Sequence, residues 1–224
     1  MQERVTWGVV VALVWGAGVA RAQPAADAEA PTDGATSPAA AEEERKRAEG
    51  FSHKGQVGLH VSGGIGYRGI FTYDEEYCGE LKDDGGNRSP CLGRSPFALD
   101  VGLAYGVART LELFVEMRFG LEKDFGPAPN MSGPRALAFS PGIKLYLGDL
   151  GPTTKFFSTL QLPIDFTDHE QLDKNDFGVR NINGLQLDVH HTFGIFFYFG
   201  EQVSWRRWLR FEVEGGLGAQ VRFP

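Results

Sequence analysis

The segment Leu209–Phe223 alternates between apolar and polar side chains almost without interruption. A two-residue period is typical of a β-strand, because successive side chains of a strand point to opposite faces. At about 3.3 Å per residue the strand would reach roughly 50 Å, far longer than a usual strand and long enough to cross a bilayer at a tilt. The segment therefore predicts one strand of a transmembrane β-barrel. Its apolar face consists of Leu209, Phe211, Val213, Leu217, Val221 and Phe223.

The beginning of the chain has the composition of a secretory signal peptide. Residues 1–4 precede an uncharged apolar run over residues 7–20. Ala20, Arg21 and Ala22 then match the small-x-small pattern that signal peptidase cleaves, so we expect cleavage after Ala22. An N-terminal membrane anchor is the alternative, but the run is short for a spanning helix and lacks a strongly basic flank. The sequence thus predicts an exported protein.

The chain changes character after the signal peptide. Residues 23–50 are rich in Ala, Pro, Asp and Glu and nearly lack aromatic and β-branched side chains. Such a segment cannot bury enough apolar surface to offset its ordering entropy. We therefore expect a signal peptide over residues 1–22, a disordered linker over residues 23–54 and a barrel over residues 55–224.

Turn-like segments set the expected number of strands. Residues 107–114 resemble residues 189–196, and each joins two alternating segments as a tight hairpin does; residues 148–152 supply a third turn midway. One interval between turns is a hairpin plus its opposite loop, so an all-β, antiparallel, up-and-down barrel of eight strands is predicted. Pro141 and Pro163 each remove a ladder donor, and we expect local bulges there. The predicted strands are 55–69, 95–108, 110–123, 135–148, 153–167, 181–190, 192–204 and 209–223.

Two features decide which face of the predicted barrel points outward. A lipocalin-like soluble barrel would turn the apolar face inward around a ligand, but an eight-stranded lumen barely accommodates its own side chains. The polar face is rich in glycine, which suits a crowded interior. We therefore expect the apolar face to meet lipid and the lumen to be filled by ion pairs rather than open. The expected lumen network contains Glu112, Glu116, Arg118, Arg210, Glu212, Glu214 and Arg222.

Together these features resemble the small eight-stranded outer-membrane barrels of the OmpA-transmembrane-domain and OmpX type. The resemblance covers residues 55–223 and rests on the signal peptide, the hairpin repeat and the closing segment 218–223. It implies that Phe223 is the assembly signal read by the barrel-assembly machinery, although family members usually end on the aromatic itself and here Pro224 follows. It also implies a monomer in the outer membrane of a Gram-negative bacterium, in contact with lipid and lipopolysaccharide.

Cys78 and Cys91 are the only cysteines of the chain. In an exported protein an isolated pair of this spacing is most simply a disulfide, which could contribute about 3 kcal/mol in the chain-entropy model. Metal ligation is the alternative, but two thiols without a neighbouring histidine make a poor site. The adjacent His190 and His191 are expected on opposite sides of a strand, so they are not expected to share a metal. We predict no metal and no cofactor.

An acid–histidine cluster at the expected outer rim is the main candidate for chemistry. It contains Asp165, Asp168, His169 and Glu170. Such clusters can be catalytic in membrane-embedded enzymes, because lipid and peptide substrates arrive at the rim, but a charged, solvated loop is the favoured interpretation.

Three functions follow from these observations. The leading hypothesis is a non-catalytic outer-membrane protein with a structural or surface-interaction role, whose outer loops bind an extracellular ligand. The alternatives are a rim enzyme (an acyltransferase, deacylase or protease using Asp168 and His169) and a narrow channel for small solutes. Nucleic acid is not an expected partner, because residues 51–224 carry 21 acidic and 17 basic side chains.

Overall fold

The computed structural model describes residues 52–71, 91–125, 132–149, 153–168 and 175–224. Within these residues no helix is long and apolar enough to cross a membrane. The strands are β1 (Val57–Phe71), β2 (Cys91–Arg94), β3 (Ala98–Gly106), β4 (Leu111–Phe125), β5 (Ser132–Asp149), β6 (Thr154–Gln161), β7 (Ile164–Asp165), β8 (Asp176–His190), β9 (Phe193–Ser204) and β10 (Leu209–Phe223).

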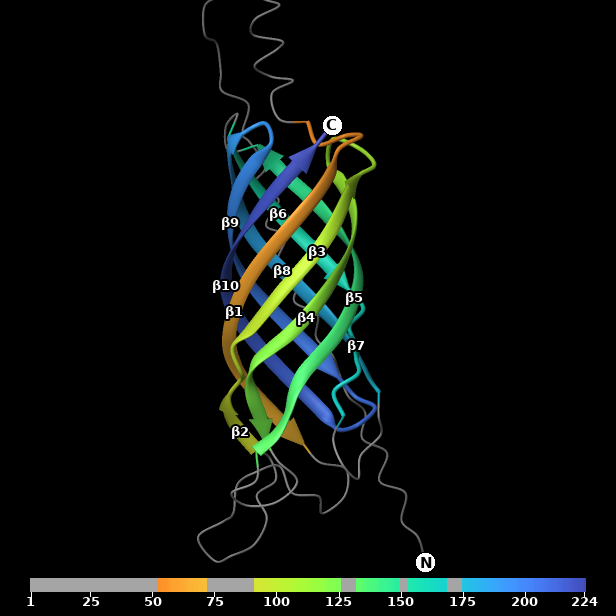
Figure 1. Ribbon diagram of the computed structural model, residues 1–224, viewed down its shortest axis with the longest axis vertical. Helices are drawn as coiled ribbons and strands as arrows, with labels where there is room; N and C mark the ends of the chain where they lie inside the picture. The colour runs from red at the N-terminus through yellow and green to blue at the C-terminus, as the bar shows by residue number, and fades with distance from the viewer. Residues whose placement is uncertain (1–51, 72–90, 126–131, 150–152, 169–174) are drawn as a thin grey trace, which may run out of the picture. The chain divides into compact units, whose positions relative to one another are not determined.

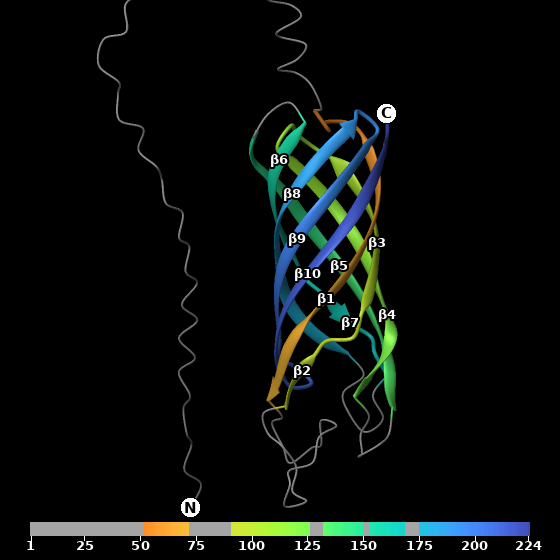
Figure 2. The same ribbon diagram turned by 90° about the vertical axis from the view of Figure 1, so that its left-hand side faces the viewer.

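The strands form one closed antiparallel barrel (Figure 1, Figure 2). The order is β10-β9-β8-β6-β5-β4-β3-β1, and β10 pairs with β1 along their whole lengths, from Val57 opposite Phe223 to Phe71 opposite Leu209. The short β2 continues β3 along β1, and the short β7 continues β6 between β5 and β8. The wall therefore has eight spanning strands, and the predicted eight-stranded barrel is confirmed.

The barrel has two different ends. The turn end carries the connections 107–110 and 191–192 and the C-terminal end of β10, and lies uppermost in Figure 1. The loop end carries β2, β7 and the connection 205–208.

Pro141 and Pro163 remove ladder donors without inserting residues. Pro163 lies in the gap between β6 and β7, whereas Pro141 pairs with Val115 of β4 in unbroken register. Across the gap, Gly142 and Ala138 of β5 pair with residues that are likewise four positions apart on the facing strand. The expectation of bulges at the prolines was therefore wrong. Each proline lacks its own N–H, but its carbonyl still accepts a hydrogen bond at 3.0 Å, from Leu162 N for Pro141 and from Gly178 N for Pro163.

The outer face of the barrel is apolar along its full height. On β10, Phe211, Val213 and Leu217 project outward, and Leu217 is 64% exposed. Aromatic side chains gather near both ends of the wall, and at the loop end the rings of Phe71 and Phe211 pack edge to face. The exposed aromatic residues include Tyr67, Phe71, Phe177, Trp205 and Phe211 near the loop end and Tyr105, Phe156, Phe193 and Phe223 near the turn end, and Phe119, Phe197 and Phe199 lie between them in the middle of their strands.

Candidate functional site: the charged lumen

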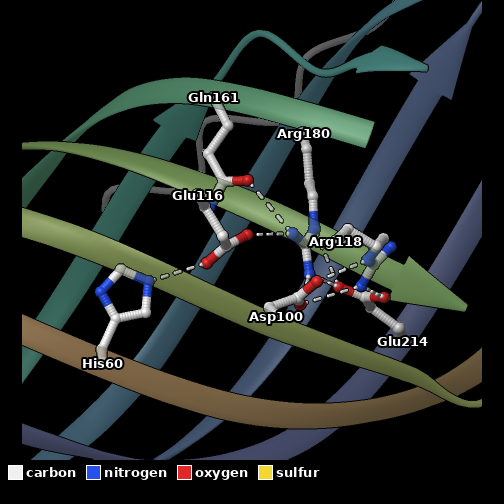
Figure 3. Close-up of polar contacts among 7 residues, drawn as sticks. All are labelled: His60, Asp100, Glu116, Arg118, Gln161, Arg180 and Glu214. Carbon is white, nitrogen blue, oxygen red and sulfur yellow. Dashed lines mark hydrogen bonds and ion pairs between the residues drawn. The ribbon is translucent and has the colours of Figure 1, made fainter. Parts of the chain in front are cut away.

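A network of buried charges, here called the central cluster, crosses the lumen (Figure 3). Each member occupies an inward position of its strand, where the alternation of the wall places polar side chains. The cluster draws on six different strands, so the closed barrel is needed to assemble it. Its members are His60 of β1, Asp100 of β3, Glu116 and Arg118 of β4, Gln161 of β6, Arg180 of β8 and Glu214 of β10.

Arg180 lies at the centre of this cluster and is only 1% exposed. Its Nη1 donates to Glu116 Oε1 at 2.8 Å and to Gln161 Oε1 at 3.2 Å. Its Nη2 donates to Asp100 Oδ2 at 3.1 Å, and Nε donates to Glu214 Oε1 at 2.9 Å. One guanidinium group therefore joins side chains from four other strands.

Arg118 supplies the second guanidinium of the central cluster. Its Nε donates to Asp100 Oδ1 at 2.8 Å, and its Nη2 donates to Glu214 Oε2 at 2.5 Å. On the other side, His60 Nε2 lies 3.0 Å from Glu116 Oε2. Two guanidinium groups thus face three carboxylates, and the His60 ring contacts one of them. Mutual pairing of this kind is what makes buried charges tolerable, because an unpaired one would carry the full cost of desolvation.

A second group of charges, here called the turn-end cluster, closes the lumen near the C-terminal end of β10. Arg222 donates through Nη1 to Glu112 Oε1 at 2.5 Å and through Nη2 to the Tyr146 hydroxyl at 3.0 Å. Lys155 Nζ lies 3.1 Å from Asp188 Oδ2. These pairs link β4, β5, β6, β8 and β10 just inside the mouth of the barrel.

His53 belongs to the turn-end cluster although it is not part of a strand of the barrel wall. It precedes β1, yet it is 2% exposed, with its two ring nitrogens 3.0 Å from Glu112 Oε1 and 3.1 Å from Asp188 Oδ2. A turn over residues 52–56 carries it inward, because Gly55 adopts φ of 79° and its N–H donates to Gly106 O at 2.7 Å. Residues 52–54, expected at the end of the disordered linker, thus belong to the ordered barrel end.

The charges at the loop end of the lumen are also paired. Arg210 Nη1 lies 3.5 Å from Asp165 Oδ2, and Arg68 Nη1 donates to Asp124 Oδ2 at 2.8 Å. Glu212 is buried and lines the same region as Arg210. All seven side chains of the expected lumen network therefore point inward, six of them buried and Arg118 nearly so, and the structure distributes them over three levels of the lumen.

Two small cavities lie on opposite sides of the central cluster. The one towards the loop end is lined by Arg68, Arg210 and Arg180, and the other is lined by His60, Glu116 and aromatic rings; each has a volume of about 40 Å³. A volume of this size holds only a few water molecules. Arg180 and Glu116 stand between the cavities and contact each other, so the cluster divides the lumen.

Arg180 and His53 are among the lumen residues that the sequence did not predict, as are Gln161 and Asp124. The predicted strand begins at residue 181, whereas β8 begins at Asp176 and includes Arg180. The available signal was the alternation of outward Phe177 and Val179 with inward Gly178 and Arg180. No periodic signal marks His53, which lies in a turn before the first strand.

The structure describes two of the four residues of the expected rim cluster, Asp165 and Asp168. Asp165 points into the lumen and accepts a hydrogen bond from Thr167 N at 2.8 Å, so it does not lie at the rim surface. Asp168 is exposed, whereas His169 and Glu170 lie outside the described residues. A catalytic pair of Asp168 and His169 thus stays a prediction.

The remaining sequence-predicted sites differ in what the structure describes. Ala22 and Cys78 lie outside the described residues, so the cleavage site and the disulfide stay predictions; Cys91 begins β2. Phe223 is half exposed on the outer face.

The two adjacent histidines lie at the tip of the β8–β9 hairpin. The rings of His190 and His191 contact each other with centroids 3.8 Å apart, because the register shifts between Asp188 and His190. The expectation that they point to opposite sides was therefore wrong. Within the described part of the chain, no group of three or more His, Cys, Asp or Glu side chains is placed to hold a metal ion.

The barrel is similar in fold to several solved structures. No protein-family model matches the chain, and no curated protein matches it in sequence. The N-terminal β-barrel domain of Pseudomonas aeruginosa OprF is 13% identical with a TM-score of 0.47, covering 76% of this chain and 98% of that one. Neisserial surface protein A gives 13% identity, a TM-score of 0.47 and coverage of 76% and 100%. The attachment invasion locus protein Ail of Yersinia pestis is 12% identical with a TM-score of 0.42, and the match covers 76% of this chain and 99% of that one.

Proposed function

We propose that this chain is an integral outer-membrane barrel with a structural or surface-interaction role, and that its lumen is a sealed scaffold without catalysis. The observation that supports the proposal is the inversion of the usual arrangement: charged side chains are buried inside the wall, and apolar ones are exposed outside it. A water-soluble barrel would gain nothing from this arrangement, since exposed apolar patches of more than a few hundred Å² are rare on soluble monomers.

The distribution of aromatic residues supports the membrane assignment. Exposed aromatic rings lie at both ends of the outer face, and its middle carries aliphatic side chains such as Val61 and Val115 together with Phe119, Phe197 and Phe199. Aromatic girdles of this kind mark the two membrane–water interfaces of transmembrane barrels. We place the turn end in the periplasm and the loop end outside the cell, because short periplasmic turns and longer outer connections are typical of these barrels.

The interior supports a closed scaffold over a channel. Cavities of about 40 Å³ lie on opposite sides of the central cluster, and the turn-end cluster lies across the periplasmic mouth. A solute crossing the barrel would have to break several buried, charge-assisted hydrogen bonds. An external partner would then bind at the loop end.

Cell fractionation combined with gel electrophoresis of unheated and boiled samples tests the proposal. We expect the protein in the outer-membrane fraction, with faster migration when unheated because the barrel stays folded. Planar bilayers containing the protein should show no steady conductance. Recovery in the soluble periplasmic fraction would overturn the membrane assignment, and stable ohmic channels would overturn the sealed lumen.

A further inference from the structure

Two cations face each other on the outside of the barrel at its loop end. Lys123 of β4 and Arg135 of β5 are direct partners in the antiparallel register, and both side chains are exposed. Like charges directly opposite each other destabilise a sheet, because their Cβ atoms lie only about 5 Å apart. An anion bound to both side chains would offset this repulsion.

No carboxylate supplies that anion within the described part of the chain. The nearest acidic residue along β4 is Glu122, which accepts hydrogen bonds from Arg94 Nη2 at 2.6 Å and from the Phe97 N–H at 3.0 Å. Asp124, on the other side, points inward and pairs with Arg68. The connecting residues 126–131 contain no acidic side chain by sequence. Among the described residues, the two positive charges therefore have no carboxylate partner.

The position of the pair relative to the apolar band identifies the class of ligand. Leu121 and Leu137 are the neighbouring outward side chains on the same two strands, and both are exposed. Lys123 and Arg135 come next toward the loop end, so they stand at the loop-end border of the apolar surface. The bulge between Phe119 and Lys123 adds two residues to β4, and an even number leaves the inward–outward alternation intact.

We propose that Lys123 and Arg135 form a binding site for the phosphate group of an anionic lipid in the outer leaflet. This inference rests on the proposed outer-membrane location and adds a specific contact to it. A phosphate can accept hydrogen bonds from an ammonium and a guanidinium group at once, and the planar Arg side chain suits two of its oxygens. The acyl chains of the same lipid would pack on Leu121 and Leu137, the next outward side chains toward the turn end.

Native mass spectrometry of the full-length protein in detergent micelles tests the site. The probes are diphosphoryl lipid A, phosphatidylcholine and inorganic phosphate. The Lys123→Gln/Arg135→Gln variant should bind lipid A about tenfold more weakly, since it loses charge-assisted hydrogen bonds. The Lys54→Gln/Arg109→Gln variant removes the same charge at the turn end, where both residues are exposed, and should bind like the unmodified protein.

Resistance to urea gives an independent readout, because the effect of the double substitution on stability should change sign with the lipid composition. In phosphatidylcholine vesicles the Lys123→Gln/Arg135→Gln variant should resist urea at least as well as the unmodified protein, because repulsion is removed. In vesicles that also contain lipid A it should resist urea less well, because the bound phosphate is lost. Equal lipid A binding by the two proteins would overturn the site, and equal competition by inorganic phosphate would overturn the lipid as its ligand. Failure of the unmodified protein to insert into vesicles would instead refute the outer-membrane proposal.

Discussion

Replacing Arg180 by methionine tests whether the central cluster stabilises the barrel. The guanidinium group contacts four acceptor side chains and is almost completely buried. Without it, three carboxylates would share only Arg118 and His60. Removing one partner from a buried ion pair costs about 3–5 kcal/mol, because the other charge stays buried without compensation. We expect a loss of that size in the free energy of unfolding of Arg180→Met.

Urea unfolding of the refolded protein in lipid vesicles measures this loss, with tryptophan fluorescence and gel migration as the two probes. Arg94→Gln is the matched control, because the Arg94–Glu122 pair lies on the barrel surface and about half of each side chain is exposed. An exposed pair contributes little, so this control should unfold almost like the unmodified protein.

A second substitution separates charge imbalance from lost packing. In Arg180→Met/Glu214→Gln one cation and one of the carboxylates that it paired with are removed together, so part of the stability should return. Contacting residues in such networks typically show coupling of about 0.5–3 kcal/mol. If Arg180→Met does not refold, Arg180→Lys keeps the charge with fewer donors and should give an intermediate loss. A loss no larger than that of Arg94→Gln, or no coupling with Glu214→Gln, would refute the reasoning.

Three further substitutions test other parts of the argument. Val115→Arg, which places a charge in the middle of the outer face, should lower the free energy of unfolding in vesicles by about 2–4 kcal/mol, and a spin label at position 115 should be accessible to oxygen but not to water-soluble quenchers. His53→Ala should speed tryptic cleavage after Lys54 without changing gel migration of the barrel, because the turn over residues 52–56 loses its buried contacts. Phe223→Ala should lower the outer-membrane level of the protein more than Leu217→Ala, an equally apolar outward position of β10.

The strand pattern could be predicted because its causes are local. Each strand of the wall has one face toward the lumen and one toward the outside, so alternation repeats along every strand and survives in the sequence. The closing strand β10 has the predicted bounds, and Glu116, Arg118 and Glu214 lie on the predicted inward face. Successive side chains of a strand alternate between the two faces, so an inward position can be predicted without knowing the partner strands.

The contacts within the lumen could not be predicted in the same way. Arg180 meets Glu116, Asp100 and Glu214 only because the closed barrel brings β8 opposite β4, β3 and β10, and none of these strands adjoins β8. His53 was assigned to the linker because its position depends on a turn held by Gly106, about fifty residues away along the chain.

The inward-facing glycines show how the sequence matches the packing of the lumen. Small residues were expected inside because an eight-stranded lumen is narrow, but the structure shows a more specific reason. A Cβ atom on Gly64 would collide with the hydroxyl of Tyr198, one on Gly216 with the ring of Tyr198, and one on Gly218 with the ring of Phe196. Gly216 and Gly218 are the direct register partners of Tyr198 and Phe196, so each glycine makes room for a large side chain of the neighbouring strand β9. The interior is filled by matching large side chains of β9 with glycines on β10 and β1 beside it, so the aromatic partner should be reduced in size when one of these glycines is substituted.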